Sequence, residues 1–434
     1  MERKGIMKFH HESSLNWGVL ASLVGAALIA TLFTPAPVSA QPPEPEPDAI
    51  ISQLFLPMIG GGGNGSAEAV DSAGAAARPG ARPALKLIID TDPGVDDALA
   101  LAWLFSQRER NLNVLGIVSV AGNASITNTT SNVLTILNRA GVSGVPVVKG
   151  AAAPLVQRLS KTSYFLHGPD GLWFQGSQNL ADIPLLPNDA ASFYCDTLAV
   201  NSDAMILALG PLTNLANALN QCPDNRWNGI PIVVLGGAKF GGNKTPVAEF
   251  NFWQDPEAVE RLLLAAGTAY TPGPLVKIVP FDTFREATID RREVERLATK
   301  GNAVMRFLAP ALLNYISVQE QNGATPVVPD AVAALFAVDS SVGTTLPALT
   351  KIVTEAGKAR GQSIIGLAVA ERLGMIATDD ELSALAEAFF IPPSFDLQAA
   401  LGGILFRELD NSQFMNSVRR DVISRNILPS LRSR

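Results

Sequence analysis

Four aspartates stand within eight residues of this chain, in the segment DTDPGVDD at positions 90–97. The preceding run 85–89 is apolar apart from one lysine, which predicts a buried strand, and the Pro-Gly pair predicts a tight turn. Asp96 and Asp97 then fall in the first turn of a helix, where carboxylates are favourable. Because four adjacent anions repel one another, the pattern predicts a hard, oxygen-seeking cation such as Ca²⁺.

Two common acidic loops do not match this segment. An EF-hand loop counted from Asp90 needs Gly at its sixth position and Glu at its twelfth, where Val95 and Leu101 stand. A phosphatase loop of the haloacid dehalogenase type needs Thr or Val two residues after its second aspartate, and Gly94 stands there. An acidic helix turn without a ligand is the remaining alternative. Asp90 and Asp92 argue against it, because they precede the helix and gain little from its dipole.

The composition describes a globular protein with a substantial core. Of 434 residues, 47% are hydrophobic and 17% are charged, which excludes a disordered chain. The net charge of −7 argues against nucleic acid as a partner. The chain has two cysteines, Cys195 and Cys222, and their spacing leaves open whether they pair or remain separate thiols.

The N-terminus predicts export. Arg3, Lys4 and Lys8 precede an apolar run over 17–33, and a small-residue cleavage site ends at Ala40. We expect residues 1–40 to be a cleaved secretory signal peptide. The mature protein would then be secreted or extracytoplasmic, with no stable membrane insertion. An uncleaved leader that anchors the protein to the membrane is the alternative.

The rest of the chain divides into a linker and one domain. Residues 41–84 are rich in Pro, Gly and Ala and predict a disordered linker, within which the apolar stretch 50–59 has no assigned role. Residues 85–434 form the predicted folded domain.

Apolar runs alternate with helical stretches over the first two thirds of this domain. This alternation predicts an α/β, doubly wound, mostly parallel sheet, followed by a mainly helical C-terminal part from Asp290 with further strands after Lys351. In such sheets ligands bind beyond the carboxyl ends of the strands. Further strands are expected at 114–120, 145–148, 205–209, 230–235 and 276–281, and helices at 127–140, 189–200, 211–219 and 256–266.

Amides and a carboxylate follow several of these strands. Asn123 follows the second strand, Asn214 follows the strand ending at 209, and a Gly-rich loop after the next strand leads to Asn243, Glu249 and Asn251. Only two lysines lie in that loop, so a strongly anionic ligand is not expected. The amides and the carboxylate instead predict a neutral ligand rich in hydroxyls, such as a sugar.

The motifs of this chain resemble those of a known family. The segment 90–97 resembles the signature of the inosine-uridine-preferring nucleoside hydrolases, and the resemblance covers residues 85–339 well. It implies a Rossmann-like core, a homo-oligomer, and calcium-dependent hydrolysis of a ribonucleoside to free base and ribose, as in purine and pyrimidine salvage. Five more motifs carry it in the same order: GN at 122–123, HGPDGL at 167–172, GPLTN at 210–214, PVAEFN at 246–251 and DPE at 255–257.

The resemblance also implies a role for individual residues. Asp92 would be the base that takes a proton from a calcium-bound water, and the metal would be held by Asp92, Asp97, the backbone carbonyl of Leu209, and Asp330. The ribose would be held by Asp96, Asn123, Asn243, Glu249 and Asn251.

One position departs from the family pattern. Many members carry a histidine directly before the distal metal-binding aspartate, and this histidine protonates the departing base, whereas Pro329 precedes Asp330 here. His167 is the one histidine that follows the predicted leader, and we predict it as the replacement acid. A structural histidine in a Gly-flanked loop is the alternative. Tyr164 or Tyr315 could supply the proton instead.

The base could also leave without a proton. That route needs an aromatic ring that makes the base more basic by stacking on it, for which the candidates are Trp173, Phe174 and Trp253. Because Pro329 removes the usual acid, the second hypothesis is an exported nucleoside- or ribose-binding protein without turnover. The retention of Asp92, which a binding protein does not need, speaks against it.

Overall fold

The computed structural model describes residues 84–107, 111–160, 163–174, 185–186, 189–268, 271–367 and 410–433. The predicted signal peptide and almost all of the predicted linker lie outside the described residues. Among the described helices, none is both long enough and apolar enough to cross a membrane.

The central strand is β1 (Leu85–Thr91), the predicted strand that leads into the acidic segment. It pairs in parallel with β2 (Leu112–Ser119) on one side and β5 (Met205–Ala208) on the other. Its side chains alternate between two cores: Leu87 and Ile89 pack into one and Ile88 into the other. Both faces of β1 are therefore buried, as its apolar sequence requires.

The sheet is mostly parallel, as predicted. Strands are added outward from β1 to β4, and the chain then returns to place β5, β6 and β7 on the other side of β1. The change of direction between β1 and β5 is a topological switch point, where such sheets leave a crevice for a ligand. The order is β4 (Leu185–Leu186), β3 (Val147–Lys149), β2, β1, β5, β6 (Pro231–Leu235), β7 (Leu275–Val279), β10 (Ser412–Val418), β8 (Gly343–Ile352) and β9 (Ser363–Gly366).

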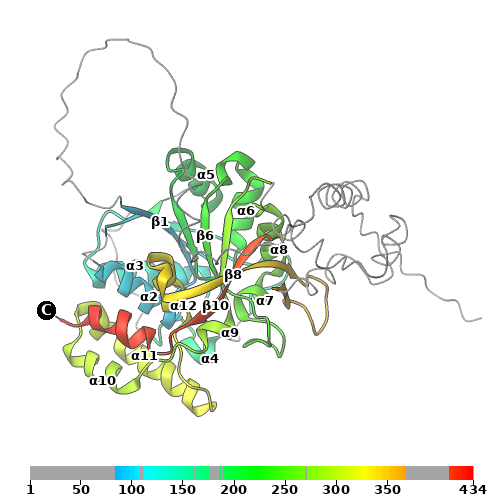
Figure 1. The fold of residues 1–434 in the computed structure, drawn as a ribbon. Helices are drawn as coiled ribbons and strands as arrows, with labels where there is room; N and C mark the ends of the chain where they lie inside the picture. The colour runs from blue at the N-terminus through cyan, green and yellow to red at the C-terminus, as the bar shows by residue number, and fades with distance from the viewer. Residues whose placement is uncertain are drawn as a thin grey trace, which may run out of the picture. The chain divides into compact units, whose positions relative to one another are not determined.

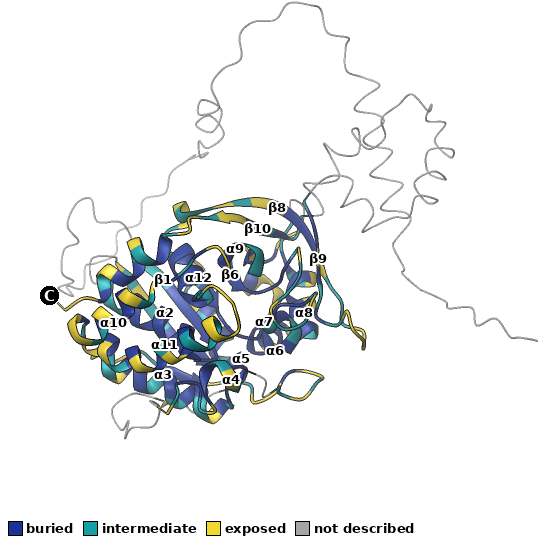
Figure 2. Cartoon of the chain, turned by 90° about the horizontal axis from the view of Figure 1, so that it is seen from below, coloured by how far each residue is buried: buried dark blue, intermediate teal, exposed yellow. Residues whose placement is uncertain are grey.

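Helices cover both faces of this sheet (Figure 1). Figure 2 shows β1 as buried, whereas α10 (Arg291–Lys300) presents exposed residues to solvent. One face carries α2 (Val95–Ser106), α3 (Ile126–Ala140), α11 (Ala303–Gln321) and α12 (Pro329–Val338). The other carries α5 (Ala190–Val200), α6 (Thr213–Gln221) and α8 (Pro256–Ala265).

Several element boundaries differ from the prediction. Strands in the C-terminal part begin at Gly343 rather than after Lys351, and β10 and β8 extend the main sheet through an antiparallel pair. Pro211 lies two residues before α6 instead of starting it. Short helices that the apolar pattern did not reveal are α4 (Tyr164–His167), α7 (Phe250–Gln254), α9 (Phe281–Phe284) and the 3₁₀ or π turns at Asp224–Trp227, Ser340–Val342, Ile423–Ile427 and Leu428–Leu431.

The two cysteines form a disulfide. Cys195 lies in the middle of α5 and Cys222 directly follows α6, with their Cα atoms 5.2 Å apart. The bond joins two helices on the same face of the sheet. It resolves the alternative that the sequence left open.

Candidate active site

The first aspartate of the acidic segment supports the fold. Asp90, the sixth residue of β1, accepts hydrogen bonds from the Tyr194 hydroxyl (2.8 Å) and from Nδ2 of Asn214 (3.1 Å). Burial raises the pKa of Asp90 to about 7, although both hydrogen bonds act in the opposite direction. The carboxyl group is therefore tied to α5 and α6, consistent with a supporting role.

Asp92 is completely buried and is fixed through one oxygen only. Its Oδ2 accepts the backbone N–H of Asn123 at 2.7 Å, whereas its Oδ1 has no hydrogen-bond partner. Two glycines make room for this carboxylate: a Cβ would lie 2.1 Å from Oδ2 on Gly122 and 2.6 Å from Oδ1 on Gly210. Burial, and next the charge of Asp97, raise the pKa of Asp92 well above its usual range.

Asp97 is held in the first turn of α2 by three donors. Its Oδ1 accepts the Thr91 hydroxyl at 2.5 Å, and its Oδ2 accepts the Gly94 N–H and Nδ2 of Asn123, each at 3.0 Å. Burial raises the pKa of Asp97 to about 7, with a further contribution from the neighbouring charge of Asp96. The turn predicted from the Pro-Gly pair thus brings β1, the loop after β2 and α2 together around one carboxylate.

Three carboxylates meet where α2 and α12 begin. Asp96, Asp97 and Asp330 each place an oxygen within 4.8 Å of the others, and all three are buried. Oδ1 of Asp96 and Oδ1 of Asp330 have no hydrogen-bond partner, as is also true of Oδ1 of Asp92. Buried carboxylate oxygens without donors, in an all-oxygen set, fit a hard cation such as Ca²⁺.

This group agrees only in part with the predicted metal ligands. It contains Asp97 and Asp330, and it adds Asp96, a predicted ribose ligand. Asp92 does not belong to it, although its charge raises the pKa of Asp330 together with burial and the larger effects of Asp96 and Asp97.

Asn251 connects the predicted metal and ribose residues. Its Nδ2 donates to the carbonyl of Leu209 at 2.7 Å and to the carbonyl of Leu235 at 3.2 Å. These carbonyls follow the end of β5 and close β6. The side chain of Asn251 therefore orients the carbonyl that is the predicted metal ligand.

Glu249 caps α7 and fixes the loop that follows β6. Its carboxylate accepts the backbone N–H groups of Gly237 (3.0 Å), Asn251 (2.9 Å) and Phe252 (3.1 Å). Burial raises its pKa to about 7 despite these donors. The Oδ1 atom of Asn243 accepts the Phe250 N–H at 2.9 Å, so both predicted ribose ligands also shape α7.

A cavity of about 500 Å³ lies beyond the carboxyl ends of β1, β5 and β6. Asp92 and Asp97 are fully buried and are absent from its lining. Eight of the predicted site residues line it: Asp96, Asn123, His167, Leu209, Asn243, Glu249, Asn251 and Asp330. Six other lining residues lie outside the named motifs and carry no signal of a role in the sequence: Ser163, Phe165, Leu166, Leu235, Lys244 and Phe284. Phe250 also lines the cavity and belongs to the motif at 246–251.

His167 and Tyr315 form the wall beside Asp96. Nδ1 of His167 accepts the Val95 N–H at 3.1 Å, so the proton of the neutral imidazole sits on Nε2. Burial lowers the pKa of His167, and the charge of Asp96 partly opposes that effect. The Tyr315 hydroxyl donates to Oδ2 of Asp96 at 3.0 Å, and its ring lies 5.3 Å from the imidazole. Both side chains are therefore engaged in positioning the first turn of α2.

The predicted stacking residues do not line this cavity. Trp173, Phe174 and Trp253 lie outside the described lining, as does Tyr164, whereas Phe165, Phe250, Phe284 and Tyr315 supply its aromatic surface. Position within a motif therefore identifies Phe250 but not the other rings of the site. Which rings face the cavity depends on helix orientation, which a sequence does not give.

Ser363 supports the same loop from the C-terminal part. Its hydroxyl accepts the Ala238 N–H (2.8 Å) and donates to the Ala238 carbonyl (2.7 Å). This contact joins β9 to the turn that presents the Gly237 N–H to Glu249. No local sequence signal predicts it, because 125 residues separate the partners.

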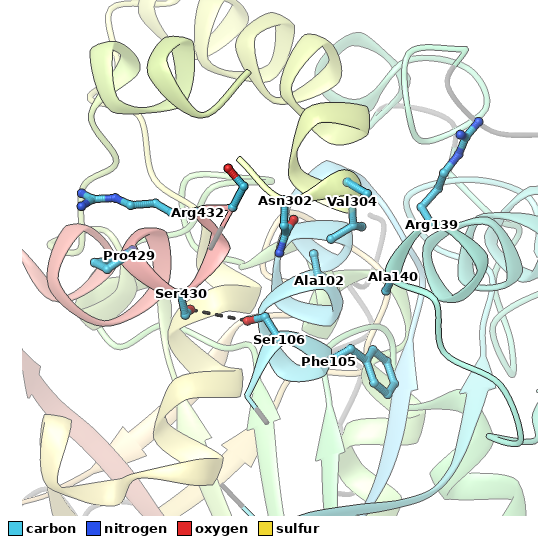
Figure 3. Close-up of a pocket in the computed structure, with 12 residues that line it drawn as sticks. Ala102, Phe105, Ser106, Arg139, Ala140, Asn302, Val304, Pro429, Ser430 and Arg432 are labelled. Atoms are coloured by element: carbon cyan, nitrogen blue, oxygen red, sulfur yellow. Dashed lines mark hydrogen bonds between the residues drawn. The ribbon is translucent and has the colours of Figure 1, made fainter. Parts of the chain in front are cut away.

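A second cavity of about 480 Å³ lies at the other end of α2 (Figure 3). It opens between Ser106, Arg139, Asn302 and Ser430, and the two serine hydroxyl oxygens are 3.5 Å apart. Its described lining holds no carboxylate. The length of α2, roughly 18 Å for 12 residues, separates it from the acidic cavity.

Fold and site together define an α/β protein with an acidic cavity at the switch point of a doubly wound sheet. The family model described as inosine-uridine preferring nucleoside hydrolase matches residues 87–387. The chain belongs to this family, which confirms the resemblance seen in its motifs.

Several relatives are similar over part of their length. A rice protein (Oryza sativa subsp. japonica) described as probable uridine nucleosidase 1 is 40% identical over 51% of this chain and 66% of its own. The rice probable uridine nucleosidase 2 is 37% identical over 43% and 56%, respectively. The pyrimidine-specific ribonucleoside hydrolase RihA of Salmonella schwarzengrund is 35% identical over 53% and 70%. The aligned stretches thus span less than two thirds of each rice protein.

Solved structures share the fold. A plant nucleoside hydrolase, PpNRh1, superimposes with a TM-score of 0.66 at 24% identity, covering 81% of this chain and all of that one. A purine-preferring ribonucleoside hydrolase from Gardnerella vaginalis gives a TM-score of 0.62 at 24% identity, covering 80% and 98%.

Proposed function

We propose that this chain is an exported, calcium-dependent nucleoside hydrolase that cleaves the N-glycosidic bond of ribonucleosides. The observation that carries this proposal is the set of three buried carboxylate oxygens without partners, on Asp92, Asp96 and Asp330, at the acidic cavity. Carboxylates without donors are costly inside a protein unless a cation or substrate satisfies them. Membership in the nucleoside hydrolase family supports the same reaction.

The residues that would hold Ca²⁺ are Asp92, Asp97, Asp330 and the carbonyl of Leu209, with Asp96 beside them. The mutual repulsion of these groups and their hard oxygen donors support this assignment. When bound, the cation would neutralise this charge and polarise a water molecule.

Asp92 is the proposed general base. Its two oxygens are in different situations: the Asn123 N–H fixes Oδ2, and Oδ1 remains able to take a proton. A carboxylate positioned in this way can act as a general base.

The remaining carboxylates and amides suit the sugar. Asp96, Asn123 and Glu249 line a cavity of about 500 Å³, a size that accommodates a nucleoside. Cleavage of the glycosidic bond places positive charge on the ribose ring, and buried carboxylates stabilise that charge where water is excluded.

Export and partners are proposed on separate grounds. The disulfide between Cys195 and Cys222 supports an oxidising, extracytoplasmic compartment. We propose a small-molecule nucleoside as the partner, no nucleic acid, a cleaved leader without stable membrane insertion, and a homo-oligomer as the family resemblance implies.

A nucleoside- or ribose-binding protein without turnover is the second candidate. Pro329 favours it, because this residue lines the cavity where the family carries a proton donor.

One assay separates the two candidates. The mature protein is incubated with calcium and a panel of purine and pyrimidine nucleosides, and the ribose formed is measured as reducing sugar. We expect ribose from at least one nucleoside, and a loss of at least 100-fold in the Asp92→Asn variant, in line with the roughly 10²–10⁴-fold contribution of a general base. Nucleoside binding without ribose formation in the wild-type protein would instead identify a binding protein.

A further inference from the structure

The wall of the acidic cavity next to Asp330 is built around Pro329. Pro329 lines the cavity and begins α12, and its ring carries no proton to donate. The base of an ordinary nucleoside needs a proton donor in this cavity if it is to leave as a neutral molecule. The neighbouring side chains therefore decide how the base departs.

The two hydroxyl groups that line the cavity have other acceptors, and His167 is held through Nδ1. The Tyr315 hydroxyl donates to Asp96 (3.0 Å), and the Ser163 hydroxyl donates to the Asn123 carbonyl (3.0 Å). Nδ1 of His167 accepts the Val95 N–H (3.1 Å), so an added proton on this nitrogen would break that hydrogen bond. Using either hydroxyl as an acid would disturb the contact to Asp96 or to Asn123, and protonation of Nδ1 would release the first turn of α2.

Charge in the cavity favours a cation. Its described lining contains Asp96, Glu249 and Asp330, with one lysine, Lys244, among them. Asp92 and Asp97 lie buried beneath, so carboxyl groups outnumber the single lysine around the cavity.

Lys244 is the one basic residue other than His167 in the described lining. It lies in the loop after β6, where its Nζ is 4.4 Å from the centre of the Trp253 ring and 3.4 Å from Oγ of Ser160. The loop also carries Asn243, a proposed ribose ligand. The ammonium group of Lys244 is therefore held against Trp253 and Ser160.

Two phenylalanine rings line the same cavity as the carboxyl groups. Phe165 is 62% exposed and lines the cavity together with Phe284. Aromatic faces attract cations, and the attraction is strongest when the cation has lost water.

We infer that this site prefers ribosyl compounds whose base carries a positive charge, such as N-ribosylpyridinium or N7-alkylated purine nucleosides. The inference rests on the hydrolase function proposed above. In the reaction the water oxygen bonds to C1′, the C1′–N bond breaks, and its electron pair neutralises the cationic base. Asp92 takes a proton from the water. The base then leaves without gaining a proton, so the absence of a proton donor at Pro329 does not slow the reaction.

Four probe compounds test this preference. Nicotinamide riboside and 7-methylguanosine carry cationic bases, uridine carries a base that needs a proton, and 4-nitrophenyl riboside is neutral but needs none. We expect kcat/KM for both cationic compounds to exceed that for uridine by about 10²–10⁴-fold, the usual contribution of general acid catalysis. We also expect KM to be lower for nicotinamide riboside than for 4-nitrophenyl riboside, because only the former is attracted by the carboxylates.

Variants at position 329 separate the missing proton from intrinsic reactivity. Pro329→His should raise the ratio of kcat/KM for uridine to kcat/KM for nicotinamide riboside by at least 10-fold, since general acid catalysis helps only a base that must gain a proton as it leaves. Pro329→Ala, which removes the proline without adding a donor, should not raise uridine hydrolysis. The comparison of substrates on the wild-type protein stands even if Pro329→His does not fold.

Two results would overturn the inference while leaving the hydrolase function intact. One is a kcat/KM for uridine equal to that for both cationic compounds in the wild-type protein. The other is a Lys244→Met variant that loses uridine hydrolysis but keeps nicotinamide riboside hydrolysis, which would identify Lys244 as the proton donor. Failure to release ribose from any of the four compounds would contradict the hydrolase function itself.

Discussion

The hydroxyl of Tyr315 donates a 3.0 Å hydrogen bond to Oδ2 of Asp96, a residue 219 positions earlier in the chain. Both side chains are buried, and Oδ1 of Asp96 is left without a hydrogen-bond partner, 3.6 Å from Nδ1 of His167. This contact joins α11 to the first turn of α2. It fixes the orientation in which Asp96 presents its remaining oxygen to the acidic cavity.

The Tyr315→Phe variant tests the consequence of this contact. Hydrogen bonds to charged groups contribute about 1.5–3 kcal/mol, so we expect kcat/KM for the best substrate to fall by about 10- to 100-fold. Steady-state kinetics measures this change. Tyr164→Phe is the control, because Tyr164 lies on the neighbouring α4 but outside the described lining of the cavity. An equal loss in both variants would show that the Asp96 contact is not the cause.

Metal binding can be tested without reference to activity. Asp330→Asn removes one charge from the acidic group around Asp96 and Asp97, so its Ca²⁺ affinity in isothermal titration calorimetry should fall by more than the roughly 100-fold that loss of an outer-shell partner costs. Asp97→Asn should lower the Ca²⁺ affinity by a similar factor. Asp90→Asn should bind Ca²⁺ as the wild-type protein does, because Asp90 faces Tyr194 and Asn214. Unchanged Ca²⁺ affinity in Asp330→Asn would show that the metal assignment is wrong.

Gly122 leaves no space for a side chain beside Asp92. A methyl group there would lie 2.1 Å from Oδ2, so Gly122→Ala should displace the carboxylate. Displacements of about 1 Å can cost roughly 10²-fold in rate, and we expect kcat to fall by about that factor. Gly141→Ala serves as the control: its φ is 65°, nothing lies within 4 Å of the added atom, and the cost is about 1–2 kcal/mol of stability only. Equal kcat in both variants would refute the steric argument.

The buried Asp90 predicts a specific pH dependence of stability. Burial raises its pKa from 3.8 to about 7 in the folded protein, so between these values the folded state keeps a proton that the unfolded state has lost. The free energy of unfolding should therefore fall as the pH rises from about 4 to 7, by at most about 4 kcal/mol. Asp90→Asn cannot ionise and should lack this component.

Urea denaturation of wild type and Asp90→Asn at pH 5 and pH 8 measures the effect. The free energy of unfolding of the wild-type protein, relative to that of the variant, should be lower at pH 8 than at pH 5. A difference that does not change with pH would show that Asp90 ionises normally in the folded state.

The sequence predicts well the part of this site that neighbouring residues form. The apolar strand, the Pro-Gly turn and the first turn of α2 are determined by neighbouring residues, so the placement of Asp92 and Asp97 follows from short-range rules. The parallel arrangement also follows from the alternation of strands and helices.

The rest of the site depends on contacts between residues that are far apart in the sequence. Tyr315 is a candidate proton donor by sequence, but its actual partner, Asp96, is set by how α11 packs on α2. Likewise, β10 and β8 join the main sheet because of tertiary packing, and Ser363 reaches the turn before Glu249 only in that arrangement. Periodicity and motifs carry no information about such pairings.

Calcium-dependent ribose release is the decisive measurement for the proposed reaction. The mature protein is treated with a chelator, dialysed, and assayed for ribose and free base from its best nucleoside before and after Ca²⁺ is restored. We expect negligible release without Ca²⁺ and equimolar ribose and base once Ca²⁺ returns. Undiminished release from the chelator-treated protein would contradict a calcium-dependent hydrolase.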